Sequence, residues 1–303
     1  MSSVLPSSGR QFELRSGEQR AVVVEVGAGL RSYSVDGREL LDGYGTNEMA
    51  TAGRGQVLMP WPNRIEDGQY EFAGTRHQLP LNEPEEGNAI HGLVRWSSWS
   101  VAREEPDRAV LAHTLHPQPG YPFSLALSLD YSLSDQGLRV SSTAANVGSA
   151  ACPFGSGAHP YLTLGTNTVD PILLQAPART VLLFDARGRP IGAEPVEGTV
   201  YDFRQARPIG TTKLDHTFAD LQREDDGLAR APPRRAHVDP LAQRELPLLP
   251  ALHRRRAAER EPPQPRRRTD DMPAKCLPLE GRSPGARAGP IDDGRLGDPA
   301  DRR

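Results

Sequence analysis

The chain has 303 residues and a formal charge of −3, with 37% hydrophobic and 25% charged residues, a composition typical of a globular protein. The sequence contains no run of about 18 apolar residues, so it predicts no membrane span. Its start lacks a basic segment followed by an apolar one, so we expect no secretory signal. The two cysteines, Cys152 and Cys276, are too few for a disulfide framework, and neither has the CxxC spacing of a zinc site. We therefore expect a cytoplasmic protein.

The charge is distributed unevenly along the chain. Residues 231–303 contain 16 Lys and Arg against 11 Asp and Glu, a net of +5, whereas the remainder carries 20 against 28, a net of −8. The same segment has 13 Pro and 15 Arg but no Phe, Trp or Tyr. Such a segment cannot bury enough apolar surface to offset the entropy of ordering, so we expect it to be disordered or irregular. Because it has no interleaved aromatic residues, it does not predict a nucleic-acid-binding arm.

The first 230 residues show the pattern of strands joined by short turns. A short apolar run covers 21–26, and alternation over 30–35 leads into Asp36-Gly37, a dipeptide typical of tight hairpins. Residues 69–73 predict a strand that ends at Gly74. Further strands are expected at 109–115, 124–133, 138–147, 171–175 and 180–184.

Residues 124–133 give the clearest strand pattern. Apolar residues occupy every second position and polar residues fill most of the opposite face, as in a half-buried strand; the apolar positions are Leu125, Leu127, Leu129, Tyr131 and Leu133. We find no amphipathic helix of three turns. Many strands with frequent turns predict an all-β sandwich or barrel.

Three short segments combine residue types suited to proton transfer and to binding hydroxyl groups. They are PWPNRI (60–65), NAIHGLVRW (88–96) and GAHPYL (157–162), with LDHTF (214–218) further on. Imidazole gives and takes protons near neutral pH, so His91 and His159 are candidate acid–base groups. The residue before Pro160 is restricted to extended geometry, which fixes where the His159 side chain points. Candidate partners for sugar hydroxyls and ring faces are Asn63, Arg64, Asp215, Trp61, Trp96 and Tyr161.

Each candidate also has a structural interpretation. A histidine in a loop is more often structural or solvated than catalytic, and Arg64 has the alternative of a surface ion pair. We interpret the acidic run 83–86 (EPEE) as a solvated loop rather than a carboxylate pair. His77 and His113 lie in strand-like contexts, where a structural or exposed position is expected. Spacing alone does not show that the candidates meet in one pocket.

Taken together, NRIxxGxYxF, LPLNEPxxxNAIHGLVRW, AHPYLTLG and LDHTFADL resemble the aldose 1-epimerase family over roughly residues 20–230. The resemblance implies a galactose mutarotase-like fold, a large antiparallel β-sandwich whose concave face holds the sugar. It also implies an isomerase that interconverts the anomers of free hexoses such as galactose or glucose. Neither a metal nor another cofactor is then required, and the partner is a small sugar rather than nucleic acid or membrane.

The resemblance also implies roles for individual residues. Carried over by motif, His159 is the acid at the ring oxygen, and His91 is a second histidine that hydrogen-bonds near that oxygen. The family's general base is a glutamate in a C-terminal LEPG element. Glu280 matches that element only loosely and lacks the apolar strand expected before it, so we do not assign Glu280 as the base. The residues implied to bind substrate are Arg64, Asn63, Asp215 and Tyr161.

The last quarter of the chain resembles the product of a one-base frame change between about residues 228 and 237. GC-rich codons for IDDGRLGDPA (291–300), shifted by one base, give STTAAWGIR, a plausible final strand with a tryptophan. The same shift lets PGARAG (284–289) read LVLEPG, so that the codon of Arg287 overlaps the missing glutamate. We therefore expect 1–230 to be a C-terminally incomplete β-sandwich domain and 231–303 an out-of-frame tail, with activity severely reduced or lost.

Three alternatives stay open at this point. A genuine disordered basic extension would also explain the tail. A hexose-6-phosphate 1-epimerase would need extra basic groups for the phosphate, for which Arg95 is the nearest candidate. A non-catalytic carbohydrate-binding protein would keep the fold without the general base.

Overall fold

The structure, a computed structural model, describes residues 5–166 and 168–223. Every regular element within these two ranges is a β-strand, so the predicted all-β class is confirmed. No helix in the described part of the chain is long and apolar enough to cross a membrane. The predicted tail at 231–303, with Cys276, Glu280 and Arg287, lies outside the described residues.

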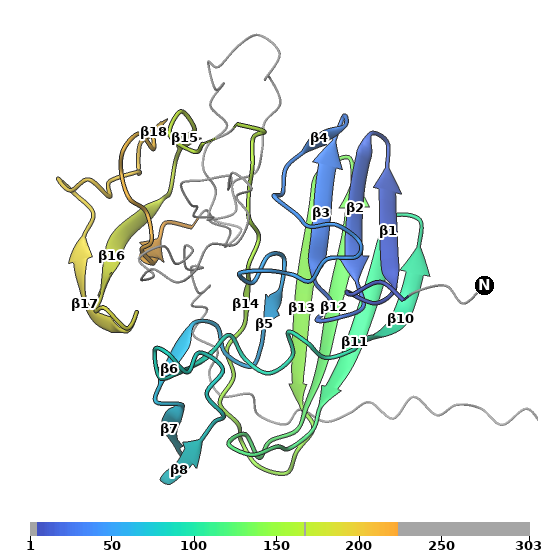
Figure 1. The fold of residues 1–303 in the computed structure, drawn as a ribbon, viewed down its shortest axis with the longest axis vertical. Coiled ribbons are helices and arrows are strands. Elements are labelled where there is room, and N and C mark those ends of the chain that lie inside the picture. Colours follow the sequence, from blue (N-terminus) through green and yellow to red (C-terminus); the bar gives the residue numbers. More distant parts are fainter. Residues whose placement is uncertain (1–4, 167, 224–303) are drawn as a thin grey trace, which may run out of the picture.

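Two four-stranded antiparallel sheets form the largest part of the fold (Figure 1). The strands of the first sheet, in spatial order, are β1 Gln11–Ser16, β2 Gln19–Val24, β3 Leu30–Val35 and β4 Arg38–Glu39. Those of the second are β10 Ser100–Glu105, β11 Arg108–Leu115, β12 Leu125–Ser134 and β13 Gly137–Asn146. Strand β1 contacts β11 and β12, and β2 contacts β12, so the two sheets pack face to face as a sandwich.

Apolar side chains fill the space between these sheets. The five alternating residues of β12 predicted to face inward are all buried, at 2–3% exposure. Phe12 and Leu14 of β1 belong to the same cluster, as does Trp99, which is 2% exposed. The hydroxyl of Tyr131 donates to the Ala28 carbonyl at 2.7 Å, so this deeply buried polar group is satisfied. Burying one leucine stabilises the fold by roughly 2 kcal/mol, so β12 contributes strongly to the sandwich.

Three short antiparallel pairs carry most of the motif residues. They are β5 Val57–Leu58 with β14 Gly157–Ala158, β6 Arg64–Glu66 with β9 Asn88–Ile90, and β7 Gln69–Phe72 with β8 Thr75–Gln78. The Met59–Pro60 peptide between β5 and β6 is cis. Figure 1 shows these pairs beside the sandwich.

A second group of strands follows β14 and has its own apolar cluster. In this cluster Val181, Phe203 and Phe218 are at most 3% exposed. Figure 1 shows the group across β5 and β14 from the sandwich. Its strands are β15 Leu173–Leu174 paired with β18 Arg207–Pro208, and β16 Ala178–Phe184 paired with both β17 Pro190–Pro195 and β19 Phe218–Leu221.

The predicted strands agree best with the structure where a turn dipeptide or alternation marks them. Asp36 and Gly37 have φ values of 52° and 73° and join β3 to β4 as a two-residue hairpin, as predicted. The strand predicted at 21–26 ends earlier, at Val24, and the chain turns at Gly27, where φ is 70°. Strands β1, β10 and β17 were not predicted. The side chains of β10 and β17 are mostly exposed and show no alternation, whereas β1 alternates and buries Phe12 and Leu14.

Candidate functional site

The β5–β14 and β6–β9 pairs bring His91 and His159 together. His91 directly follows β9, and His159 directly follows β14. Their ring centroids lie 5.3 Å apart with an interplanar angle of 86°, an edge-to-face contact. The two residues are 7% and 5% exposed. The two candidate histidines therefore share one buried position, which spacing alone did not establish.

The backbone around His91 fixes the orientation of its ring. His91 and Asn63 both have left-handed φ values, 62° and 61°. The His91 amide donates to the Asn63 carbonyl at 2.9 Å, and the Asn63 amide donates to His91 Nδ1 at 3.0 Å. Because Nδ1 accepts a hydrogen bond, the neutral ring carries its proton on Nε2, which is then a donor. A Cβ on Gly92 would lie 2.0 Å from the Met59 carbonyl oxygen, so glycine is required after His91.

His159 is held by backbone pairing and by contacts to its ring. Its amide donates to the Gln56 carbonyl, and its carbonyl accepts from the Gly55 amide, both at 2.9 Å. The imidazole stacks on the Tyr161 ring with centroids 5.1 Å apart and an interplanar angle of 11°. A Cβ on Gly53 would lie 2.9 Å from His159 Cδ2, so the backbone of Gly53 packs closely on the imidazole.

Tyr161 is itself supported from two directions. Its hydroxyl donates to the Ala52 carbonyl at 2.9 Å. The guanidinium carbon of Arg54 lies 4.5 Å from the centroid of the Tyr161 ring, and Arg54 pairs with Asp42 at 2.8 Å. These contacts give Tyr161 a structural function beneath His159, beside the substrate-binding role implied by the resemblance.

Arg64 and Glu83 form a buried ion pair. Arg64 Nε and Nη2 donate to the two oxygens of Glu83 at 2.6 and 2.5 Å, and the side chains are 8% and 10% exposed. The side-chain amide of Asn88 donates to Glu83 Oε2 at 3.0 Å, and Asn88 is 0% exposed. The interpretation of Arg64 as a surface ion pair is therefore wrong. The interpretation of 83–86 as solvated holds for Glu85, which is exposed, but is wrong for Glu83.

Arg95 is a further cation in this cluster. Its guanidinium donates to Gln56 Oε1 at 3.3 Å and to the Ile90 carbonyl at 3.5 Å. Gln56 is 3% exposed, and its carbonyl accepts from the His159 amide. Arg95 therefore links the strand that leads to His91 with the backbone that holds His159.

Several buried polar atoms in this cluster have no hydrogen-bond partner among the described residues. Buried polar groups in native proteins are normally paired, so a set of such atoms in one region indicates a place where a polar ligand would bind. Sugar hydroxyls both donate and accept, which suits a set containing both kinds of atom. The atoms are Asn63 Oδ1, Arg64 Nη1, His159 Nδ1 and Trp61 Nε1.

Both histidines favour the neutral state. Burial, followed by the charge of His159 and of Arg95 and Arg64, holds the pKa of His91 well below its usual value. Burial is also the main cause that lowers the pKa of His159 to about 4. Burial likewise lowers the pKa of Arg95. The site as described therefore presents neutral imidazoles at pH 7.

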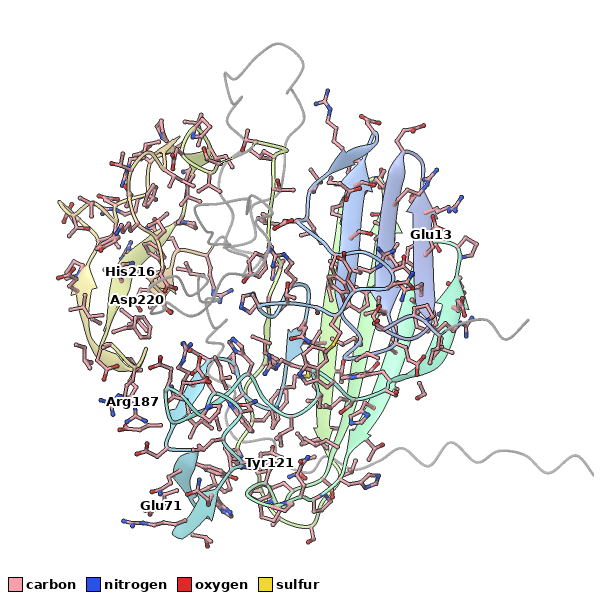
Figure 2. All side chains as sticks on the ribbon, in the orientation of Figure 1. Glu13, Glu71, Tyr121, Arg187, His216 and Asp220 are labelled. Carbon is pink, nitrogen blue, oxygen red and sulfur yellow. The ribbon has the colours of Figure 1, made fainter. Side chains whose placement is uncertain are left out.

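Asp215 lies in another part of the fold, between β18 and β19, and its amide donates to His216 Nδ1 at 3.3 Å. Figure 2 shows His216 in the β16–β19 region, across from the sandwich.

Trp96, a candidate for a sugar face, is 51% exposed. The His, Cys, Asp and Glu side chains of the described residues form no group of three that could hold a metal ion.

His77 and His113 have the structural contexts expected of them. His77 in β8 stacks on Tyr70 with centroids 4.8 Å apart. His113 in β11 lies against Trp99 with centroids 5.3 Å apart, and its Nδ1 is 3.2 Å from the Ser98 carbonyl.

Glu83, Asn88 and Gln56 were not predicted as parts of the site. Asn88 opens the NAIHG motif and Glu83 lies in LPLNEP, so both motifs contained a signal. Gln56 lies outside all the quoted motifs, and its burial follows only from the β5–β14 pairing.

The profile of the aldose 1-epimerase family matches residues 10–246. The chain belongs to the aldose 1-epimerase family. Similar proteins include the uncharacterized protein YihR of Escherichia coli, which is 41% identical over 212 residues, or 70% of this chain and 69% of that protein. Mouse galactose mutarotase is 26% identical over 242 residues, with 70% of this chain and 66% of that protein covered.

Solved structures of this family share the fold. A GalM/aldose epimerase homologue from C. elegans has a TM-score of 0.64 at 20% identity, covering 71% of this chain and 72% of that one. Galactose 1-epimerase from Lactobacillus acidophilus has a TM-score of 0.62 at 24% identity, covering 72% of each chain. The predicted galactose mutarotase-like β-sandwich is therefore confirmed.

Proposed function

We propose that this aldose 1-epimerase family member interconverts the α and β anomers of a free hexose of the galactose or glucose type. The observation that carries the proposal is the contact between His91 and His159, in a cluster that includes buried polar atoms without partners among the described residues. The name of the similar mouse protein, galactose mutarotase, supports the substrate class. We place the activity in the cytoplasm, in keeping with the buried free thiol of Cys152.

The reaction is a pair of proton transfers. A base removes the proton of the C1 hydroxyl while an acid protonates the ring oxygen, so the bond between C1 and that oxygen breaks and an aldehyde forms. After rotation about C1–C2, the reverse transfers close the ring on the other face of C1. We assign the proton transfer at the ring oxygen to His159. We assign to His91 a supporting hydrogen bond, donated by its Nε2 near the same oxygen. The residues proposed to bind hydroxyl groups are Arg64, Asn63, Asp215 and Tyr161.

The charge state of His159 places a requirement on this mechanism. With a pKa of about 4, about one His159 in a thousand is protonated at pH 7. A nearby carboxylate would raise the pKa, because an opposite charge favours the imidazolium. Both oxygens of Glu83 already bind Arg64. We propose that the general-base glutamate implied by the family resemblance would supply this charge as well as the base, and that Glu280 does not replace it.

We further propose that the chain as written lacks this glutamate because of a one-base frame change between about residues 228 and 237. Residues 1–230 are then an incomplete sandwich domain and 231–303 an out-of-frame tail. The loss of aromatic residues after 230 supports this proposal. Resequencing codons 225–240 tests it: a missing or extra base would support the frame change, and an unaltered reading frame would count against a sequencing error.

Polarimetry of freshly dissolved α-D-galactose tests the function. We expect the chain as written to leave the spontaneous rate almost unchanged and the frame-corrected chain to accelerate it. In the corrected chain, His159→Gln should lower kcat by a factor of about 100 or more, the usual contribution of a positioned acid. A corrected chain without activity on any hexose would refute the proposed function. Rapid catalysis by the chain as written would instead refute the missing base.

Two other activities have specific support. The partly buried Arg95, whose guanidinium hydrogen-bonds to neutral groups, favours a sugar with an anionic substituent, such as a hexose 6-phosphate. Faster mutarotation of glucose 6-phosphate than of glucose, with the preference lost in Arg95→Gln, would support this candidate. The engagement of Glu83 by Arg64 favours a non-catalytic carbohydrate-binding protein. Sugar binding in calorimetry without mutarotation, even after frame correction, would support that candidate.

A further inference from the structure

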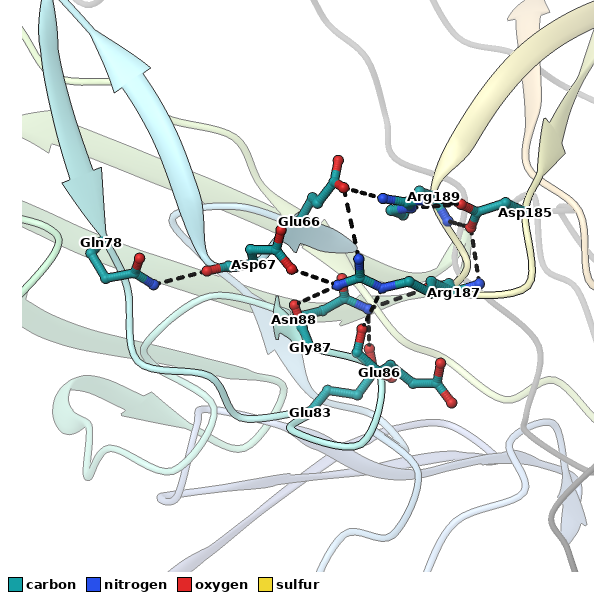
Figure 3. Close-up of polar contacts among 10 residues, drawn as sticks. All are labelled: Glu66, Asp67, Gln78, Glu83, Glu86, Gly87, Asn88, Asp185, Arg187 and Arg189. Carbon is teal, nitrogen blue, oxygen red and sulfur yellow. Dashed lines mark hydrogen bonds and ion pairs between the residues drawn. The ribbon is translucent and has the colours of Figure 1, made fainter.

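The loop between β16 and β17 contacts the strand pair that carries Arg64 and leads to His91 (Figure 3). In that loop, the guanidinium of Arg187 donates to Asp67 Oδ1 at 2.7 Å, to the Glu86 carbonyl at 2.8 Å and to the Gly87 carbonyl at 3.1 Å. Asp67 directly follows β6, and Gly87 directly precedes β9. One guanidinium therefore holds together the two chain segments at the end of this pair that is remote from His91.

The loop that presents Arg187 is itself organised by one carboxylate. Asp185 Oδ1 accepts the amides of Arg187 and Arg189 at 2.9 and 3.0 Å, and Oδ2 accepts Arg189 Nε at 2.6 Å. The hydrogen bond from Arg189 is the main cause that lowers the pKa of Asp185 to about 2. Arg189 also pairs with Glu66, the last residue of β6. Asp185 therefore organises the loop from within, and Arg189 adds a second contact with β6 beside that of Arg187.

A continuous series of contacts connects Arg187 with Arg64. The Arg187 carbonyl accepts from Asn88 Nδ2 at 3.2 Å, and the same nitrogen donates to Glu83 Oε2 at 3.0 Å. Glu83 in turn binds Arg64 through both oxygens. Asn88 is 0% exposed, so water does not compete for this amide.

The β6–β9 pair needs such support because it is short. Its register contains three residue pairs, from Arg64 opposite Ile90 to Glu66 opposite Asn88. A two-stranded ribbon of this kind is marginal on its own. Arg187 also fits closely here: a Cβ on Gly87, where φ is 66°, would lie 2.6 Å from Arg187 Nη2.

We propose that Arg187 is a positioning residue of the sugar site: its guanidinium fixes the β6–β9 pair, and with it Arg64 and the turn of His91, while its carbonyl accepts from the Asn88 side chain that also binds Glu83. The proposal rests on the proposed function in so far as that function makes Arg64 and His91 sugar-binding groups. Arg187 is a partly exposed ion-pairing residue at 34% side-chain exposure, and such pairs contribute about 1 kcal/mol or less to stability. Replacing Arg187 should therefore loosen the site more than it lowers the stability of the whole protein.

The test compares Arg187→Gln with Arg204→Gln in the full chain. Arg204 is the matched control because its side chain is equally exposed, at 33%, but pairs within its own loop, with Asp202 and Glu197. The first readout needs no ligand: the solvent-exchange rate of the Arg64 Nε proton in ¹⁵N NMR spectra. The second is the Kd for galactose by titration calorimetry. We expect Arg187→Gln to speed exchange about tenfold and weaken binding several-fold, and Arg204→Gln to change neither.

Unchanged exchange at Arg64 in a folded Arg187→Gln variant would overturn the proposal, and so would an equal increase in Arg204→Gln. Should Arg187→Gln fail to fold, Arg187→Lys decides the matter, since it keeps the charge but not the three directed hydrogen bonds, and intermediate exchange is expected. If the unaltered chain does not bind galactose, the proposed function loses its support. The exchange measurement still decides whether Arg187 fixes Arg64, because it needs no ligand.

Discussion

His91 and His159 lie in one buried cluster, but the molecule positions them by different means. Around His159 the contacts are made by backbone groups, by the Gly53 Cα and by the Tyr161 ring. The strand pair before His91 is held largely by polar side chains: the Arg187 guanidinium binds Asp67, and Asn88 and Arg64 both bind the Glu83 carboxylate. Steric fit thus dominates one side of the site, and buried charge dominates the other.

This difference predicts how each side fails. A buried charge network is costly to break at one member, because the remaining charge keeps its desolvation penalty. A close-packed ring contact responds instead to added or removed volume, usually by smaller amounts. Four substitutions or conditions separate these two behaviours.

Removing the carboxylate on the His91 side should have the largest effect. Glu83→Ala leaves the Arg64 guanidinium, 8% exposed, without its anionic partner, and we expect a loss of about 4 kcal/mol in the free energy of unfolding. Urea denaturation followed by circular dichroism measures it. The control is Glu85→Ala, an exposed acid in the same loop, which should change stability by less than about 0.5 kcal/mol. Equal losses in both variants would show that the Arg64–Glu83 pair stabilises the fold no more than the exposed Glu85 does.

Acidification should destabilise the protein through His159. The pKa of His159 is about 4 in the folded chain against 6.5 for an unperturbed histidine, so the unfolded chain takes up the proton first as the pH falls. The contribution of neutral His159 to the free energy of unfolding is fully present above pH 6.5 and is lost as the pH falls from 6.5 to 4. The loss totals about 3 kcal/mol. Urea titrations at pH 7, 5.5 and 4 should show a shallower dependence in His159→Gln than in the unaltered chain. Parallel curves would contradict the buried neutral state of His159.

Adding one methyl group beside His159 tests the steric side. Gly53→Ala places a Cβ 2.9 Å from His159 Cδ2 at a residue with φ of 80°, and we expect a loss of about 2 kcal/mol from left-handed strain plus displacement of the ring. Gly17→Ala is the control, since it has φ of 54° with nothing within 4 Å of the added Cβ, and should lose about 1 kcal/mol. Chemical denaturation compares the two, and an equal loss would mean that the imidazole moves aside freely.

The smallest effect should come from the support beneath His159. Tyr161→Phe keeps the stacked ring and removes the hydrogen bond from the hydroxyl to the Ala52 carbonyl, and we expect a loss of about 1 kcal/mol. Thermal and urea unfolding measure it. An unchanged stability would show that water replaces the hydroxyl at Ala52. A fall in sugar affinity out of proportion to the stability change would support a direct substrate contact by Tyr161.

The sequence predicted the sandwich where one face of a strand is buried and the other is not. The alternation over β12 and the Asp36-Gly37 turn each follow from a local rule, and both are confirmed. Strand β10 escaped prediction because five of its six residues are exposed. Local pattern therefore located the long core-facing strand β12 but not the exposed edge strand β10. It also did not locate the short strand β1, which buries two side chains, Phe12 and Leu14.

The site was predictable in part. The sequence motifs named His91 and His159, but their contact depends on the pairing of β5 with β14, strands far apart in the sequence. The burial of Glu83 depends on Arg64 in the neighbouring strand pair, and the acidic run EPEE (83–86) gave no hint of it. The proposed substrate-binding role of Asp215, and the frame change after residue 228, stay predictions.

The three tryptophans report on three different environments. Trp99 is buried in the sandwich at 2% exposure, and Trp96 is 51% exposed. Trp61, two residues before Asn63, packs against the edge of the core, with its ring centroid 6.5 Å from that of Tyr121. The chain contains no other tryptophan, so its intrinsic fluorescence is the sum of a core signal, a solvent signal and a site signal. Single Trp→Phe variants would isolate each one, and acrylamide quenching would then follow the site and the sandwich separately without any attached dye.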